Sequence, residues 1–446
     1  IAAMSASRAS PYTNRNVVAL ATPMIISNVT VPLLGLVDTA VMGHLESPHY
    51  LAAVAIGATI FSFIFMGLNF LRMGTTGLAA QARGANNAND VRTVLAQAVL
   101  IALGMASLLM VLQKPVGQLA MWLLAPAPDV LGAAWIYYEV RIWAAPAALT
   151  NFALVGWFIG MQNTRAPLYL MLVTNLVNIA LSVLFVVGLG YRTGGVAAAS
   201  VIAEFAGLAF GSWLVHRELC GFGGRLDWSN VLHPDRLRRI FSVNANLLLR
   251  TLSLMFVFGF ITAQGARQGT AILAANAILL QFQFFMAYAL DGFAHAAEAL
   301  VGRARGEDND HGFREAVRLS LIWSAMVALL FALAYAVAGR SIIALLTGQP
   351  ELQALTATFL PWLVVSPLVS FWSFLFDGVF VGATWAREMR NTMIASTFLV
   401  FVPVFYLTQV FGLGNHGLWL AFVTFMISRA VTMGGTYLRL AARSPD

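Results

Sequence analysis

The chain has 446 residues, of which 59% are hydrophobic and only 10% are charged. Soluble domains carry about 25% charged residues and roughly 45–50% apolar ones, so this composition excludes an ordinary soluble enzyme. The formal net charge is +7. However, the basic residues stand between hydrophobic runs and form no stripe with stacking aromatics, which excludes a nucleic-acid-binding protein.

Hydrophobic runs separated by Gly, Pro, Asn and charged residues predict twelve membrane-spanning helices. The expected spans are 16–44, 50–82, 91–113, 131–161, 166–190, 194–218, 238–264, 270–303, 313–338, 352–384, 389–412 and 416–441. Several exceed the roughly 20 residues that cross a bilayer, which predicts tilt or projection beyond it. The predicted fold class is therefore an all-α polytopic membrane protein.

The ends and loops of the chain add three expectations. Residues 1–8 are not expected to be a signal peptide, because the first apolar run is too long and no small-residue cleavage site follows it. The single cysteine, Cys220, excludes an internal disulfide framework and a paired-cysteine metal site. With both termini in the cytoplasm, the inner segments collect most of the arginines, as the positive-inside rule requires. The outer segments then hold only Lys114, Arg141, Arg192, Arg267 and Arg340.

The two halves of the chain form an internal repeat. Shifting the sequence by 222 positions, with one two-residue gap, aligns 52–56 with 274–278, 82–84 with 304–306 and Gly195 with Gly417. Parallel repeats of six helices predict two pseudo-symmetric bundles with the substrate path between them, a common transporter architecture. The predicted division is an N-terminal lobe at 1–219, a cytoplasmic linker at 220–237 and a C-terminal lobe at 238–446.

Four segments carry a family resemblance: LVDTAVMGHL at 36–45, FLRMGTTGLAAQ at 70–81, AYALDGFA at 287–294, and DGVFVGAT at 377–384 with EMRN at 388–391. They resemble the DinF-type branch of the multidrug and toxic compound extrusion (MATE) family over essentially the whole chain. The resemblance implies twelve helices in two lobes. It also implies alternating access and export of organic, often cationic, compounds, driven by inward proton or sodium flow.

A polar set in the outer half of the N-terminal lobe is the main candidate site. Asp38 lies about 9 Å inside the outer end of its helix. Asn178 and Ser182 lie about 18 and 12 Å from the outer end of the fifth span, and Ser200 lies about 9 Å inside that of the sixth, so all four fall in the outer half of the membrane. The repeat places apolar residues at the four equivalent positions of the C-terminal lobe: Phe260, Val400, Val404 and Phe422. The resemblance implies that Asp38 is the principal cation-coupling residue, with Asn178 and Ser200 beside it. The alternative is a static, hydrogen-bonded carboxyl group.

The identity of the coupling ion depends on one departure from the family. Many DinF-type members have Asp where this chain has Ser182, so the lobe lacks a second carboxylate for a sodium ion. A proton needs only Asp38, and burial favours the protonated form of a carboxyl group. Protons are therefore the expected coupling ion and sodium the alternative, with no cofactor and no bound metal. The resemblance also places a bend in the first span at Pro23, for which a static kink is an equal alternative.

Other charged groups at membrane depth are candidates by default. Asp291, His295 and Glu298 share one helix face by their spacing. An ion-pair network of this face with Arg250 is favoured over a second proton relay. Asp377 matches the cation-site position of related branches and is a secondary candidate for coupling or substrate binding. Glu204 and Arg72 are expected to form gate or packing pairs.

The favoured function is a proton-coupled exporter of lipophilic, mostly cationic compounds, not an enzyme. It is expected to act as a monomer among the lipids of the bacterial inner membrane. A lipid-precursor flippase would need several basic residues in its central cavity to hold an anionic pyrophosphate. The expectation is that only Arg72 and Arg250 lie at membrane depth, against five acids, which favours cationic substrates. A membrane-embedded hydrolase would need a histidine-rich or Ser–His constellation, and the few scattered histidines argue against it. A channel is disfavoured because the sequence has no recognisable filter repeat.

Overall fold

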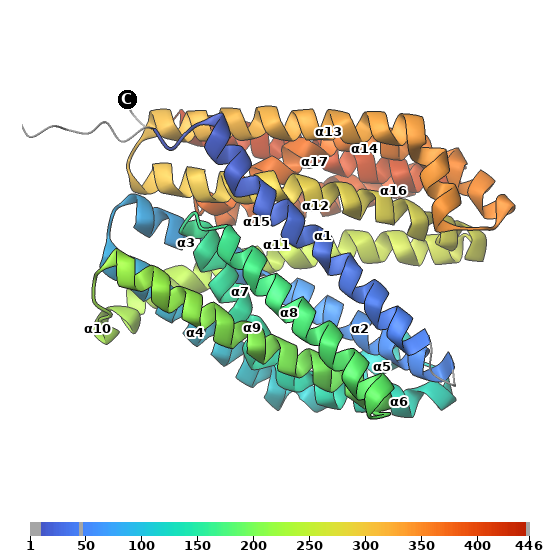
Figure 1. Ribbon diagram of the computed structural model, residues 1–446. Coiled ribbons are helices and arrows are strands. Elements are labelled where there is room, and N and C mark those ends of the chain that lie inside the picture. The colour runs from blue at the N-terminus through green and yellow to red at the C-terminus, as the bar shows by residue number, and fades with distance from the viewer. Residues whose placement is uncertain (1–9, 44–47, 443–446) are drawn as a thin grey trace, which may run out of the picture.

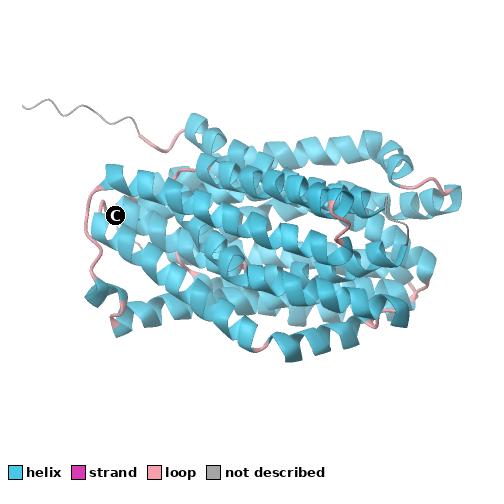
Figure 2. Ribbon diagram, turned by 60° about the horizontal axis from the view of Figure 1, so that its bottom comes forward, coloured by secondary structure: helices cyan, strands magenta, loops and turns pink. Residues whose placement is uncertain are grey.

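The computed structural model describes residues 10–43 and 48–442, and it describes side chains outside 31–48. Every regular element in this part of the chain is helical (Figure 2). The first nine helices are α1 (Asn14–Gly43), α2 (Pro48–Leu68), α3 (Phe70–Gly84), α4 (Ala88–Val111), α5 (Gln113–Leu124), α6 (Pro128–Arg141), α7 (Ala145–Gly160), α8 (Arg165–Val183) and α9 (Arg192–Phe222). The others are α10 (Trp228–Val231), α11 (Pro234–Arg267), α12 (Thr270–Gly306), α13 (Asp310–Leu346), α14 (Pro350–Gly382), α15 (Ala386–Ala395), α16 (Val402–Val410) and α17 (Gly414–Ala441).

These helices agree with the predicted spans. In the described residues, 11 helical stretches are long and apolar enough to cross a membrane. Each corresponds to one predicted span, and α1 corresponds to the remaining one, 16–44. Four spans combine consecutive helical segments: α2 with α3, α6 with α7, α8 with the π-helical turn Leu184–Gly188, and α15 with α16 through the π-helical turn Ser396–Phe401. α1 runs without a break through Pro23.

Two short helices were not predicted. α5 follows the third span directly, in the segment between the predicted spans 91–113 and 131–161, and it contains Pro115 and Gly117. Proline is tolerated in the first turn of a helix, where its missing N–H has no partner in any case. α10 lies in the linker, where Asp227 caps it by accepting from the backbone N–H of Ser229.

The spans form two bundles, the first made of α2–α9 and the second of α11–α17, and α1 crosses from one to the other (Figure 1). At the end that carries the linker and the start of α1, the two bundles share one hydrophobic core, to which α1, α3, α7, α12 and α14 contribute. Away from this end each bundle has its own core: Phe61 and Tyr138 lie in that of the first, and Phe282 and Trp419 in that of the second. We call the shared end the closed end.

Glycines bring the backbones of the bundles into direct contact at the closed end. A β-carbon added at Gly77 of α3 would collide with the carbonyl oxygen of Val381. One at Gly84 would collide with the carbonyl oxygen of Arg303, and one at Gly302 of α12 would lie 2.5 Å from the β-carbon of Ala80. Small residues allow this approach, which is how membrane helices gain packing contacts without a hydrophobic driving force.

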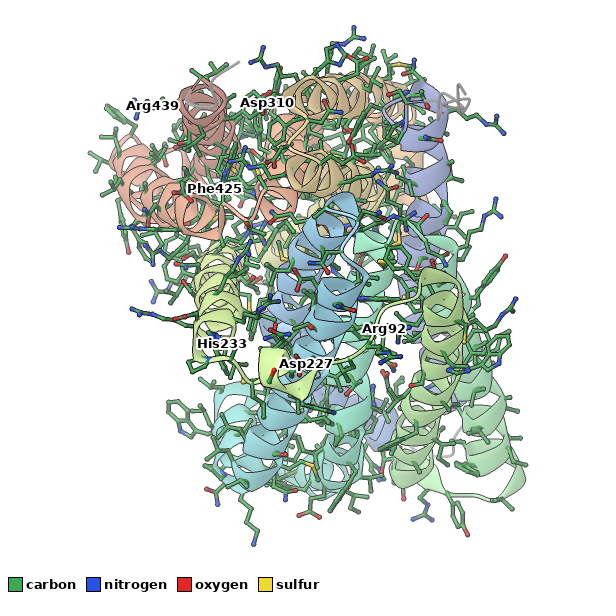
Figure 3. The ribbon with its side chains drawn as sticks, turned by 90° about the vertical axis from the view of Figure 1, so that its left-hand side faces the viewer. Arg92, Asp227, His233, Asp310, Phe425 and Arg439 are labelled. Atoms are coloured by element: carbon green, nitrogen blue, oxygen red, sulfur yellow. The ribbon has the colours of Figure 1, made fainter. Side chains whose placement is uncertain are left out.

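Polar contacts tie the linker and the start of α1 to the same end. Arg92 of α4 donates to the carbonyl oxygens of Leu219 and Gly223, each at 2.8 Å. Figure 3 looks at this end and shows Arg92 near the linker, with Asp227 and His233 flanking α10.

The phenol of Tyr12 donates to the carboxylate of Glu307 at 2.7 Å, just beyond the end of α12. Burial acts to raise the pKa of Glu307, but hydrogen bonds from Tyr12 and Arg303 outweigh it and lower this pKa. Glu307 is therefore held as a carboxylate, and it fixes the start of α1 against the second bundle.

Candidate functional site: polar clusters inside the membrane

Three members of the polar set of the first bundle, those whose side chains are described, contact one another. The Asn178 side-chain amide donates to the Ser200 hydroxyl at 2.8 Å, which joins α8 to α9. The Ser182 hydroxyl donates to the Asn178 oxygen at 3.4 Å. All three side chains are buried. The side chain of Asp38 lies outside the described residues, so its contacts remain a prediction.

The backbone of α1 brings Asp38 to the level of this set. The Asn175 amide of α8 donates to the Thr30 hydroxyl of α1 at 3.3 Å. Asp38 lies eight residues after Thr30, and Ser182 lies seven after Asn175. With about 1.5 Å of rise per residue, two helices running the same way place these positions at similar depth. The predicted partners therefore converge on one level of the first bundle.

The equivalent positions in the second bundle are filled by aromatic packing. The Phe260 ring packs edge-on against Phe401 and Phe405, with centroids 5.4 and 5.0 Å apart. Phe422 is fully buried and packs against Trp419. A cation has no oxygen ligand among these side chains, so the polar set belongs to one bundle only.

A buried ion cluster in the second bundle corrects one prediction. Arg250 of α11 was expected to pair with an acid of the 291–298 face, but it donates to Asp377 of α14 instead. Arg429 of α17 donates to the same carboxylate oxygen at 2.7 Å. Arg250 points toward α14 because of the rotation of α11 about its own axis. Spacing along the chain does not define this rotation, so the expected pairing was wrong. Two guanidinium groups therefore contact one oxygen of Asp377, and their positive charges compensate the charge of this carboxylate.

Arg429 was missed by the sequence reasoning, although an available signal marked it. It is a charged residue well inside the predicted span 416–441 and is only 2% exposed. Such a residue must find a partner at membrane depth. A complete list of intramembrane charges would have included it.

A second ion cluster crosses between the bundles. Arg72 of α3 lies 3.2 Å from a carboxylate oxygen of Glu298 of α12 and 3.3 Å from the Nδ1 atom of His295. His295 also contacts the other Glu298 oxygen at 3.3 Å. This cluster lies beside the glycine contacts of α3 and α12, so Arg72 pairs across the two bundles.

Glu204 pairs within the first bundle. Arg141 lies 3.6 Å from its carboxylate, and the Asn151 amide donates to it at 3.0 Å. Arg141 was counted with the outer segments, but it ends α6 inside the span Pro128–Gly160 and also lies over the rings of Phe61 and Phe65. Without Arg141 the outer segments hold fewer basic residues, so the predicted excess of arginines in the inner segments becomes larger. The described residues contain no group of three or more His, Cys, Asp and Glu able to hold a metal ion.

Comparison with known proteins identifies the family. The MatE family model matches the chain twice, at residues 23–184 and 246–407. The chain belongs to the MatE family. The two matches begin at residues 23 and 246, and this separation is close to the 222-position shift that aligns the two halves of the sequence. The double match therefore confirms the internal repeat.

Similar proteins support the same assignment. The chain is 44% identical to the DNA damage-inducible protein F of Escherichia coli over 94% of this chain and 91% of that protein, which confirms the resemblance to the DinF-type branch. It is 25% identical to the probable multidrug resistance protein NorM of Rhizobium meliloti, over 95% of this chain and 93% of that protein.

Solved MATE structures share the fold. The outward-facing structure of a multidrug resistance MATE transporter superposes with a TM-score of 0.86 at 19% identity, covering 98% of this chain and 97% of that one. A MATE structure in the bent conformation superposes with a TM-score of 0.87, also at 19% identity, over 98% and 96% of the two chains. These structures show that the chain has the MATE fold, and the family model and the 44% identical relative make it a multi-pass membrane transporter of this family.

Proposed function

We propose that this transporter exports lipophilic, mostly cationic organic compounds in exchange for protons, by alternating access. It would act as a monomer in the bacterial inner membrane, with both termini and the closed end in the cytoplasm. Relatives named as multidrug resistance proteins support the substrate class. The excess of arginines at the closed-end segments supports the orientation.

The carrying observation is the buried Asn178–Ser200–Ser182 cluster at the level of Asp38. It offers hydroxyl and amide groups at the level of the Asp38 backbone, and the fifth span has Ser182 where a second carboxylate would stand in many DinF-type members. A sodium ion in such a low-dielectric site needs several oxygen ligands and compensating charge. A proton needs one carboxylate that can bind and release it. Asp377, the alternative site in the second bundle, is already neutralised by Arg250 and Arg429.

The test is transport in proteoliposomes with a single imposed gradient. Tetraphenylphosphonium is a suitable probe because it is a permanent lipophilic cation whose charge does not change with pH. We expect a pH gradient alone to drive its transport and a sodium gradient at symmetric pH to drive none. Ser182→Asp should add partial sodium dependence, because it restores a second carboxylate at the level of Asp38. Ser182→Asn, which has the same size without the charge, is the matched control and should add none. Saturable sodium-driven transport by the unmodified protein would contradict proton coupling.

Alternating access requires the closed end to open and close, which predicts the effect of Gly77→Val. The added side chain would meet the backbone of Val381. Such overpacking costs about 1–3 kcal/mol, enough to shift a two-state equilibrium by roughly 5–150-fold. We therefore expect weakened closure and a matching loss of transport. Spin labels on exposed residues 221 and 311 should report a longer distance across this end.

Gly104→Val is the matched control for Gly77→Val. Position 104 is also helical, but nothing lies within 4 Å of an added β-carbon there. Transport and the label distance should stay unchanged in this variant. Equal effects of the two substitutions would show that the bundles do not separate at α3.

A further inference from the structure

Asp291 of α12 differs from Glu298 and Asp377, the other two acids at membrane depth in the second bundle, because no described residue forms an ion pair with it. Glu298 is bound by Arg72, and Asp377 is bound by Arg250 and Arg429. Among the described residues, no hydrogen bond or ion pair reaches Asp291. Its side chain is also partly exposed, whereas Glu298 and Asp377 are buried. Of the three, Asp291 is therefore the acid without a direct ionic partner among the described residues.

The charge of Asp291 completes a larger electrostatic network. Asp291 interacts electrostatically with His295, Arg72, Asp377 and Arg250, and it also interacts with Arg429. With Asp291 ionised, three arginines face three carboxylates. With Asp291 protonated, one positive charge has no counterpart at membrane depth, where an unbalanced charge is costly.

Within the described residues, the elements packed on α12 bring no other charge to this level. Tyr288, His295 and Glu298 are the titratable neighbours on α12 itself. α3, α11, α14 and α17 supply the arginines and Asp377. The described part of α1 faces α12 with Asn28, and α13 faces it with Trp323, which stacks on Phe293. Neither side chain carries a charge.

The helical turn that carries Asp291 is also the turn that holds α1. The Asn28 amide donates to the backbone carbonyl of Tyr288 at 3.1 Å. At Gly292 a β-carbon would collide with the Ile25 side chain and lie 3.1 Å from the carbonyl oxygen of Ala21. These contacts surround Pro23, and α1 lies along α12 in Figure 1. A charge change at Asp291 therefore acts directly beside the part of α1 that leads to Asp38.

We propose that Asp291 is a second proton-binding site, in the second bundle, whose occupancy is transmitted to α1 through the turn Tyr288–Gly292. The inference rests on the proposed proton coupling. A proton from water binds a carboxylate oxygen of Asp291 and leaves the arginine network with an uncompensated positive charge. That charge opposes a bound lipophilic cation and strains the α12 turn that packs on α1. Loss of the proton restores charge balance and the tight contact.

Infrared difference spectroscopy tests the site without reference to transport. The protein in lipid vesicles is titrated from acid to alkaline pH, and the C=O band of protonated carboxyl groups is followed. We expect Asp291→Asn to remove one titrating component of this band and Asp38→Asn to remove a different one. Asp227→Asn, in the exposed linker, is the control and should leave both components. An unchanged band in Asp291→Asn would overturn the proposal.

Two further measurements keep the outcome unambiguous. If Asp291→Asn does not fold, Asp291→Glu keeps a titrating carboxyl group, and its component should shift rather than vanish. An unshifted band in that variant counts against the proposal. Proton release on binding of tetraphenylphosphonium should be smaller in Asp291→Asn than in the unmodified protein. If a sodium gradient drives transport, the proposed function fails, while the infrared band still decides whether Asp291 binds a proton.

Discussion

Asp38→Asn is expected to abolish gradient-driven transport of tetraphenylphosphonium while the protein still folds and inserts. Asparagine keeps the size and hydrogen-bonding capacity of aspartate but cannot release a proton. The backbone of α1 at Asp38 lies at the level of the buried Ser182, Asn178 and Ser200, which makes this residue the coupling candidate of the first bundle. Transport in proteoliposomes under a pH gradient measures the effect, and binding of the probe to the detergent-solubilised variant shows that the fold is retained.

The repeat supplies the control for Asp38→Asn. Phe260 holds the equivalent position in the second bundle, where it packs against Phe256, Phe401 and Phe405. Phe260→Leu keeps an apolar side chain there and should reduce transport only mildly. Loss of activity as complete as in Asp38→Asn would mean that the two bundles are not functionally asymmetric. Full activity in Asp38→Asn would remove this residue from coupling.

The positions of the spans could be predicted because the bilayer leaves few choices. Backbone polar groups must be satisfied within each segment, so every long apolar run becomes a helix. The predicted span 270–303 and the observed α12, Thr270–Gly306, differ only in how far the helix continues past Arg303. α5 escaped prediction because it does not cross the membrane and its Pro115 and Gly117 are typical of loops.

The pairing of charges could be predicted only in part. The sequence places Asn178 and Ser200 on neighbouring spans in the outer half of one lobe, but the hydrogen bond between them is visible only in the packed helices. Arg250 had Asp291, Glu298 and Asp377 within possible reach. Which one it meets depends on helix rotation and on the competing Arg429 and Arg72. These are properties of the packed helices, so a linear pattern does not contain them.

Asp377→Asn is expected to destabilise the protein more than any other single change in the second bundle. Arg250 and Arg429 both donate to the Asp377 carboxylate, and both guanidinium groups are buried. Removing one partner of a buried ion pair costs about 3–5 kcal/mol, because the remaining charge is left without compensation. The measurement is thermal unfolding of the purified protein in detergent, followed by its tryptophan fluorescence.

A double-mutant cycle separates this electrostatic cost from a general packing defect. In Asp377→Asn combined with Arg429→Met, one cation leaves with the anion, so Arg72 and Arg250 face Asp291 and Glu298 in equal number. Replacing a buried ion pair by residues of similar volume is often close to neutral. The double variant should therefore recover most of the stability lost in Asp377→Asn, with a coupling energy of about 0.5–3 kcal/mol, as found for residues in contact. Additive losses would mean that Asp377 stabilises the second bundle through packing and that its two arginines find other partners.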